Sequence, residues 1–209
     1  MALTSLRRLG ASDEQLLAFQ SRYSTRIEPV RFRDAPLKGD PWHVSRGNIH
    51  HHPGLCHWFE QELKTRGRQA VLNEWIPRLI DTAGVDAFHA LIRTALAVES
   101  GVDEELSAGL AYWVGSWKSL PVEDGPRLSI TAREAFDRLR GGIDLGAPLT
   151  GMFGDQLGQL FESREFRQLI RWRGPNMGIA ELAREAAQIY LACGHFFALH
   201  MVTGTQAVH

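Results

Sequence analysis

Apolar residues recur along most of this 209-residue chain at the spacing of three and four that places them on one face of an α-helix. No stretch alternates between apolar and polar residues for long enough to predict a β-strand. The signals that begin helices fall where this pattern requires them. Ser12 with Gln15, and Thr131 with Glu134, have the spacing of a capping box, in which two side chains satisfy the first free amides of a helix. We therefore predict an all-α protein.

The same pattern divides the chain into helices and connections. Residues 26–54 hold four prolines and three glycines without a sustained period, which predicts an ordered surface connection that wraps the domain. Gly67 and Gly101 are expected to end helices, and Pro77 to kink its helix or to start it. At this length, one helical-bundle domain over residues 1–209 is the simplest expectation. The predicted helices cover residues 13–23, 55–67, 69–84, 85–101, 103–120, 131–142, 154–172 and 179–201.

Charge and cysteine content narrow the class of protein. The 23 Lys and Arg against 24 Asp and Glu leave a formal charge of −1 without a basic stripe, so we expect no nucleic-acid partner. The longest apolar stretch, residues 189–202, is shorter than the roughly 18–20 residues of a membrane span and predicts a buried helix instead. Cys56 and Cys193 match no ligand or redox spacing, and no secretory segment is evident, so we expect two core thiols in a cytoplasmic protein.

Nine histidines offer candidate sites, and the densest group is His50, His51, His52 and His57. Adjacent imidazoles in a proline-containing loop can capture a metal ion, yet neighbouring residues of an extended backbone point to opposite sides. We favour loop decoration at the start of a helix, and keep a divalent-metal carrier as the alternative.

His89 lies in a predicted helix, one turn before Arg93. A cation at this spacing disfavours a protonated imidazole and keeps the ring neutral, which is the state that binds a metal ion or accepts a proton. A core histidine that hydrogen-bonds to a neighbouring helix is an equally good interpretation of this position.

His195 and His200 lie in the apolar stretch near the carboxyl end. On a helix this spacing of five residues separates them by about 140° around the axis, so they cannot bind one ion as a pair spaced by four would. Both faces of the helix are apolar, and we expect it to be buried all round. A buried imidazole without a partner costs about 2 kcal/mol, so each ring should meet a metal ion, a substrate or a polar network.

Familiar cofactor and catalytic motifs are missing. The glycines of the segment GMFGDQLG have the spacing of neither a dinucleotide fingerprint nor a P-loop, so the sequence gives no support for a Rossmann cofactor site. There is likewise no HExxH motif, no CxxC pair and no GxSxG elbow. Trp113 and Trp117 lie one turn apart on a predicted helix, which is more typical of a core than of a substrate wall.

Three segments together resemble the questin oxidase-like family: AFHALIRTALAVESG, followed closely by ELSAGLAYW, and YLACGHFFALHMVTGTQAV near the carboxyl end. The resemblance covers most of the chain. It implies an all-helical oxidoreductase whose fungal relatives cleave an anthraquinone ring in a Baeyer–Villiger-like reaction, and some relatives use non-haem iron held by histidines. It further implies a small aromatic or apolar substrate and NADPH as external reductant. A homodimer is expected because two-fold oligomers are the commonest.

On this resemblance, His89 and His200 are carried over as iron ligands, with His195 as a further candidate. Family members usually carry a His-Asn-His segment just before the residues that match MALTSLRRLG, and this chain begins after it, so we expect one source of ligands to be missing. The alternative function is a non-catalytic helical binding protein that keeps an apolar ligand pocket. The residues expected to line the substrate pocket are Arg93, Trp113, Phe196 and Phe197.

Overall fold

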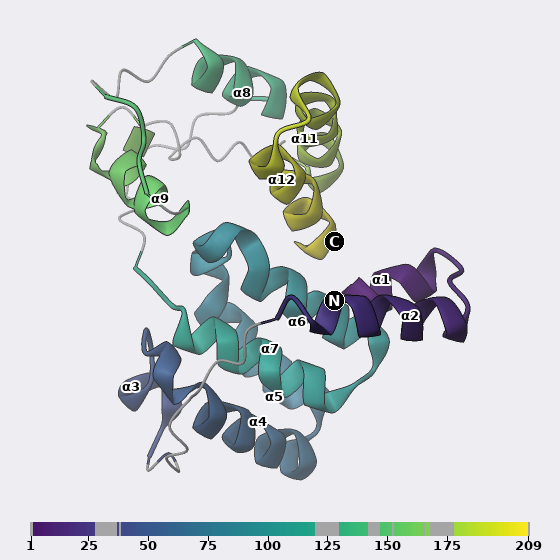
Figure 1. Cartoon of the computed structure of the whole chain (residues 1–209). Helices are drawn as coiled ribbons and strands as arrows, with labels where there is room; N and C mark the ends of the chain where they lie inside the picture. Colours follow the sequence, from purple (N-terminus) through teal and green to yellow (C-terminus); the bar gives the residue numbers. More distant parts are fainter. Residues whose placement is uncertain are drawn as a thin grey trace. The chain divides into compact units, whose positions relative to one another are not determined.

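The computed structural model describes residues 2–27, 37, 39–119, 130–141, 147–151, 153–164, 166–167 and 178–208. In these ranges every regular element is a helix, which confirms the predicted all-α class (Figure 1). None of these helices combines the length and the apolar character needed to cross a membrane. The chain divides into two compact units, which are described separately. Unit 1 is Met1–Leu79 with Ile92–Trp117, and unit 2 is Ile80–Leu91 with Lys118–His209.

Unit 1 is built on the packing of helix α4 (His52–Arg66) against helix α7 (Asp103–Gly115). Leu55, Phe59 and Leu63 recur every four residues on α4 and are buried. Gly109 and Gly115 of α7 allow a close approach, since a Cβ added to them would lie 3.0 Å from Oγ1 of Thr94 and 3.2 Å from Cα of Ile49. The other described elements of unit 1 are α1 (Ala2–Arg8), α2 (Asp13–Ser24), α3 (Pro41–Val44), the 3-10 helix η1 (Ile49–His51), α5 (Arg68–Leu79) and, from Ile92 on, α6 (His89–Ser100).

Aromatic rings fill the core of unit 1 beside α5. Trp75 is fully buried and meets the rings of Trp58 and Phe59 edge to face, with centroids 5.6 and 4.9 Å apart. Such pairs contribute about 0.5–1.5 kcal/mol each beyond the area they bury. These contacts make the aromatic residues of α4 and α5 the structural centre of this unit.

Unit 2 is built on helix α11 (Ile179–Cys193) and helix α12 (Phe196–Val208), which lie side by side (Figure 1). Helix α8 (Ala132–Arg140) packs on α11, and the 3-10 helix η3 (Val85–Phe88) packs on α12. The backbone N–H of Ala132 donates to Glu181 of α11 at 3.0 Å, which ties the start of α8 to the start of α11. The other described elements of unit 2 are η2 (Ile80–Thr82) and α9 (Phe153–Glu162).

Both predicted capping boxes are confirmed. The Ser12 N–H donates to the Gln15 side chain at 2.8 Å, and the Gln15 N–H donates to the Ser12 hydroxyl at 3.3 Å. The same reciprocal pair joins Thr131 and Glu134 at the start of α8, at 2.8 and 3.1 Å. The hydrogen bonds from the Thr131 backbone and side chain lower the pKa of Glu134.

Gly67 ends α4 as predicted. Its backbone φ of 79° is one that residues other than glycine rarely adopt. Pro77 does not start its helix, because α5 already begins at Arg68 and continues to Leu79. The 3-10 helix η2 follows directly, so the proline lies in the last turn of α5, where the amide hydrogen that it lacks would otherwise bond to the carbonyl of Asn73.

The helix predicted over 85–101 is wrong in its first turn. Asp86, Ala87 and Phe88 have φ values of 50°, 54° and 65°, and the α-helix begins only at His89. Left-handed backbone at three residues other than glycine is unfavourable in isolation, so nothing in the local sequence signals it.

The helix predicted over 179–201 is also wrong, because the chain breaks at Gly194. This glycine has a φ of 60° and a ψ of 13°, which ends α11 at Cys193 and lets α12 fold back. The pair of helices is not buried all round, since Leu191 is 83% exposed and Phe196 is 62% exposed.

Parts of several predictions lie outside the described residues. They are residues 28–36 and 38 of the predicted connection, the helix end at residue 120, Gly142, and the predicted helix at residue 165 and from residue 168 to 172.

The two cysteines differ in their surroundings. Cys193 is exposed, so the expected core position is wrong for this thiol. Cys56 is half-buried, and its Sγ lies 3.5 Å from Nδ1 of His52. Burial raises the pKa of the Cys56 thiol to about 11, while Arg93 opposes the rise. Burial also lowers the pKa of His52, so this neighbour is predominantly neutral near pH 7.

We predict that iodoacetamide at pH 8 alkylates Cys193 at least about tenfold faster than Cys56, because the thiolate is the nucleophile and the raised pKa leaves little of it at Cys56. Mass spectrometry of the native protein gives both rates, and the variant Cys193→Ser isolates the slower one. The rate at Cys56 should climb as the pH rises from 8 toward 11. Equal rates for the two thiols at pH 8 would show that Cys56 is not shielded.

Candidate functional site

His89 is placed by the left-handed turn that precedes it. Backbone strain of this kind costs about 1–3 kcal/mol per residue and persists only where tertiary contacts hold it. Here the contact is between Phe88 and Gly204 of α12, where a Cβ added to the glycine would lie 2.9 Å from Cγ of the Phe88 ring. Only glycine leaves room for this approach. The ring of Phe88 therefore packs against the backbone of α12 and turns the following residue toward that helix.

His200 lies on α12, four residues after Phe196, and is 8% exposed. Its Nδ1 lies 2.9 Å from the carbonyl oxygen of Phe196. Because a carbonyl can only accept, Nδ1 carries the hydrogen, and Nε2 of the neutral ring keeps its lone pair. The helix thus fixes both the orientation and the tautomer of this imidazole.

The structure brings His89 and His200 together although 111 positions separate them in the chain, with their Nε2 atoms 3.0 Å apart. The two rings meet edge to face, with centroids 4.9 Å apart at an angle of 71°. Since His200 Nε2 offers a lone pair, the neutral pair is joined by a hydrogen bond in which His89 Nε2–H donates. Both rings belong to unit 2.

Burial is the main reason why the pKa of His89 is lowered, and His200 lowers it further, while Asp86 acts in the opposite direction. His89 is therefore predominantly neutral near pH 7. The sequence also predicted a neutral His89. It attributed this state to Arg93, whereas in the structure burial and His200 lower the pKa. A neutral imidazole can bind a metal ion or accept a proton.

His195 does not join this pair. It lies exposed between α11 and α12, where its Nδ1 accepts a hydrogen bond from the backbone N–H of Phe197 at 3.3 Å. Its ring is 5.4 Å from that of Phe197. None of its described contacts involves His89 or His200, so its assignment as a ligand stays a prediction.

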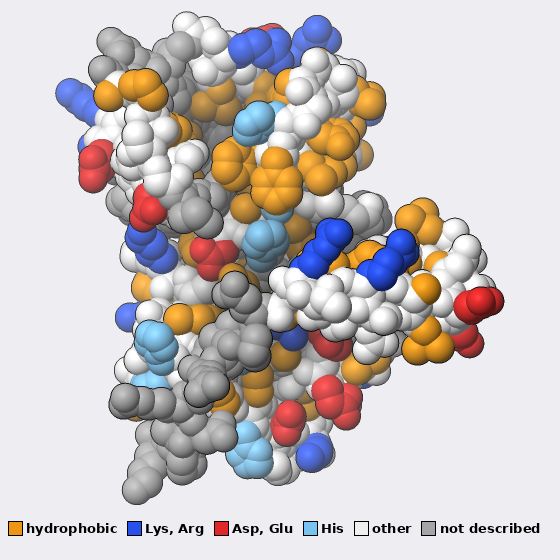
Figure 2. All heavy atoms as spheres, viewed as in Figure 1, with side chains coloured by type: hydrophobic (Ala, Val, Ile, Leu, Met, Phe, Trp, Pro, Cys, Tyr) orange, Lys and Arg blue, Asp and Glu red, His pale blue; other side chains and the backbone are white. Residues whose placement is uncertain are grey.

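The four residues predicted to line a substrate pocket fall into two groups. Phe196 lies next to the pair, with its ring centroid 4.3 Å from that of His200, and Phe197 packs against Phe196 at 6.0 Å. Arg93 and Trp113 belong to unit 1, where Arg93 Nη2 lies 3.4 Å from Glu105 and Trp113 is fully buried. Figure 2 shows hydrophobic side chains gathered over the α11–α12 hairpin, with histidine among them.

The histidine-rich segment before α4 has a structural role in the described part of unit 1. His51 lies 3.0 Å from the hydroxyl of Ser45 and 3.2 Å from the side-chain amide of Asn48. These contacts tie the loop to itself just before α4 begins. Loop decoration and the divalent-metal carrier both stay predictions.

A group of three or more histidine, cysteine or carboxylate side chains placed to hold a metal ion is not found among the described residues. The histidine pair therefore supplies two donors by itself. Sequence reasoning missed Phe88 and Gly204, the residues that support the pair. The single signal for them was a glycine inside an apolar helical stretch, which often marks a close approach of backbone.

Comparison with known families supports the resemblance seen in the sequence. Residues 1–135 match the model of one protein family, described as questin oxidase-like. The chain belongs to the questin oxidase-like family. His89 lies inside the matched residues, and His200 lies beyond them. No curated protein and no solved structure matched the chain.

We predict that Gly204→Ala lowers the free energy of unfolding by about 1–3 kcal/mol, because the new methyl group must displace the Phe88 ring. The same displacement should release His200, so diethyl pyrocarbonate should modify it faster than in the parent protein. Urea unfolding and peptide mass mapping measure the two effects. Gly154→Ala is the matched control, since a Cβ there meets nothing within 4 Å. Equal effects of the two substitutions would contradict the role given to Gly204.

Proposed function

We propose that this protein is an oxidoreductase that inserts oxygen into a small aromatic or polycyclic ketone, and that the His89–His200 pair is its reacting centre. Membership of the questin oxidase-like family supports the general class. The observation that carries the proposal is the 3.0 Å separation of the two Nε2 atoms. The substrate class follows from the resemblance, with NADPH as the external reductant.

The donor set fits a metal ion at the pair. Two imidazole nitrogens bound to one ion at about 2.1 Å, and at right angles, lie about 3.0 Å apart. Binding through both Nε2 atoms requires the hydrogen of His89 to move from Nε2 to Nδ1. The Nδ1–H of His200 is held by a backbone carbonyl, which is the supporting hydrogen bond that metal-binding histidines usually make. His89 and His200 would hold a non-haem iron ion, which would supply the activation of dioxygen when bound.

The remaining chemistry belongs to this chain's own side chains. His89 is neutral and half-buried. Once its hydrogen bond to His200 is broken, the ring can rotate and point its lone pair in another direction. The exposed ring of Phe196 lies against His200 and offers a flat apolar face to an aromatic substrate. A substrate stacked on that face would hold its carbonyl beside the pair and displace water from it.

The alternative function, a helical binding protein without catalysis, predicts a different arrangement of the same two histidines. In such a protein the histidines would lie far apart, each with its nitrogens bonded to backbone carbonyls. One nitrogen of His200 does bond to a carbonyl, but the other meets His89. The geometry therefore favours the enzyme.

We predict that the protein, purified without an affinity tag and stripped with a chelator, takes up about one Fe(II) per chain under anaerobic conditions. His89→Ala and His200→Ala should each weaken this uptake at least about tenfold, because each removes one imidazole donor. Calorimetry and elemental analysis measure the affinity and the iron content. His57→Ala is the matched control, since that exposed imidazole lies on α4 in unit 1.

Activity is measured separately as dioxygen uptake with a hydroxyanthraquinone and NADPH. We expect uptake by the iron-loaded protein and its loss in both variants. His89→Gln removes the imidazole, but its amide can still donate a hydrogen bond to His200. A loss of dioxygen uptake in this variant therefore does not come only from misfolding. Iron binding unchanged by both alanine substitutions would overturn the proposed ligands.

A further inference from the structure

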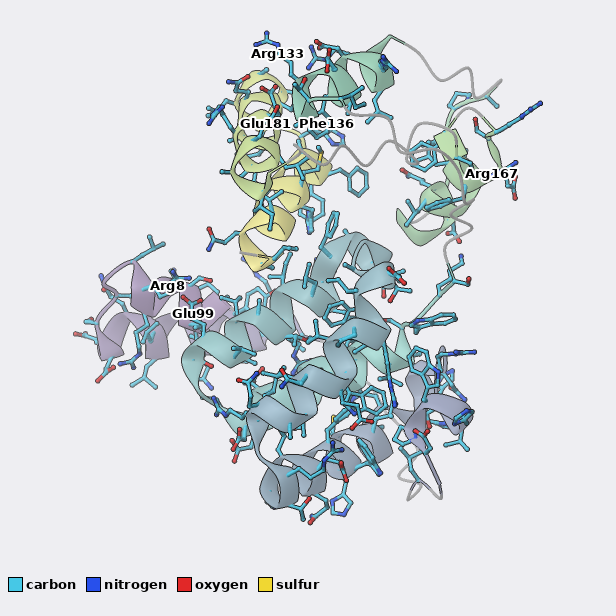
Figure 3. All side chains as sticks on the ribbon, turned by 180° about the vertical axis from the view of Figure 1, so that it is seen from behind. Arg8, Glu99, Arg133, Phe136, Arg167 and Glu181 are labelled. Atoms are coloured by element: carbon cyan, nitrogen blue, oxygen red, sulfur yellow. The ribbon has the colours of Figure 1, made fainter. Side chains whose placement is uncertain are left out.

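A pocket lies in unit 2 between α8 and α11, and neither His89 nor His200 lines it. Its volume of about 470 Å³ falls within the range of about 300–1,000 Å³ that small-molecule sites occupy. Figure 3 marks this junction by Arg133 on α8 and Glu181 on α11. The lining comes from one face of each helix: Arg133, Asp137 and Arg140 from α8, and Glu185, Gln188, Ile189, Ala192 and Cys193 from α11.

Glu185 is the unusual member of this lining. It is only 8% exposed, and it makes no hydrogen bond or ion pair with any residue that the structure describes. A carboxylate removed from water without a partner is costly, and such groups in folded proteins are normally paired. The carboxylate oxygens of Glu185 are not among the described buried polar atoms that lack a partner, so they stay open to the pocket, where a cationic group of a ligand can pair with them.

The other charges of the pocket restrict what that ligand can be. Arg140 is already engaged by Asp137, with Nη1 and Oδ1 3.2 Å apart. Arg133 is exposed and takes part in none of the ion pairs found within the described part of the chain. One negative and one positive side chain are therefore left over. A simple amine would match only Glu185, and a simple anion only Arg133.

We propose that this pocket binds a zwitterionic α-amino acid with an apolar side chain. Its ammonium group pairs with Glu185 and its carboxylate pairs with Arg133. The apolar side chain lies on Ile189 and Ala192, which stand next to the carboxylate on the same face of α11. The net charge of such a ligand is zero, as is that of the pocket, so binding leaves no charge unpaired.

The experiment is a calorimetric titration of the full-length protein with three probes. L-leucine carries both charged groups, 3-methylbutylamine lacks its carboxylate, and 4-methylpentanoate lacks its ammonium group. We expect saturable binding of L-leucine, with each partial analogue at least about tenfold weaker. If L-leucine gives no saturable heat, or if either partial analogue binds as tightly, the zwitterion proposal is overturned.

Variants locate the binding on the two charged side chains. Glu185→Gln and Arg133→Gln should each weaken the binding of L-leucine at least about tenfold, because each removes one charge of the pair. Glu14→Gln, a change at an exposed residue of α2 in unit 1, is the matched control and should bind as the parent does. Binding of L-leucine that survives Glu185→Gln would place the ligand elsewhere and contradict the proposal.

A stability measurement guards against misfolding. Since the carboxylate of Glu185 has no partner in the fold, Glu185→Gln should melt no lower than the parent protein in the absence of ligand. A clear drop in the melting temperature would show that the carboxylate is satisfied within the fold, which removes the premise. The readouts are binding and melting, so a failure of iron loading would leave this test unaffected.

Discussion

The contact between the Phe88 ring and the backbone of Gly204 holds the candidate site together. It is the contact that holds three successive residues in the left-handed region of the backbone, immediately before His89. Those residues direct the chain so that α6 begins with its first side chain facing α12. The strain is stored beside the pair of imidazoles, as is common where a protein must hold reactive groups in one geometry. A larger residue at this position of α12 would displace the Phe88 ring and disturb both the turn and the pair.

Local rules predicted much of the fold. The two capping boxes placed the starts of α2 and α8, because the hydrogen bonds that define a box are made within four residues. Gly67 was equally clear as a helix end. The errors before His89 and at Gly194 have different origins. The first turn is held by a contact over long sequence distance. At Gly194 the flanking residues are apolar with helical spacing, so the pattern continued across the break.

The candidate site was less accessible to sequence reasoning than the fold. His89 and His200 were carried over as ligands from the family resemblance. The residues alone left a core histidine as an equally good interpretation of His89, and for His200 they predicted only that its ring meets a metal ion, a substrate or a polar network. Placing His195 on one continuous helix with His200 concealed that the first of these lies exposed at a break. Glu185 gave no signal at all, since a glutamate in an amphipathic helix is expected to face water. Only its burial in the folded chain distinguishes it from its neighbours.

The direct test of the account is nuclear magnetic resonance of protein labelled with ¹⁵N in its histidines, recorded near pH 7 without metal. We expect that His200 carries its hydrogen on Nδ1 and His89 on Nε2, and that ring protons of these two residues show a nuclear Overhauser cross-peak. Two rings with the same Nε2–H tautomer and no cross-peak between them would contradict the central claim that the fold brings these two imidazoles into contact.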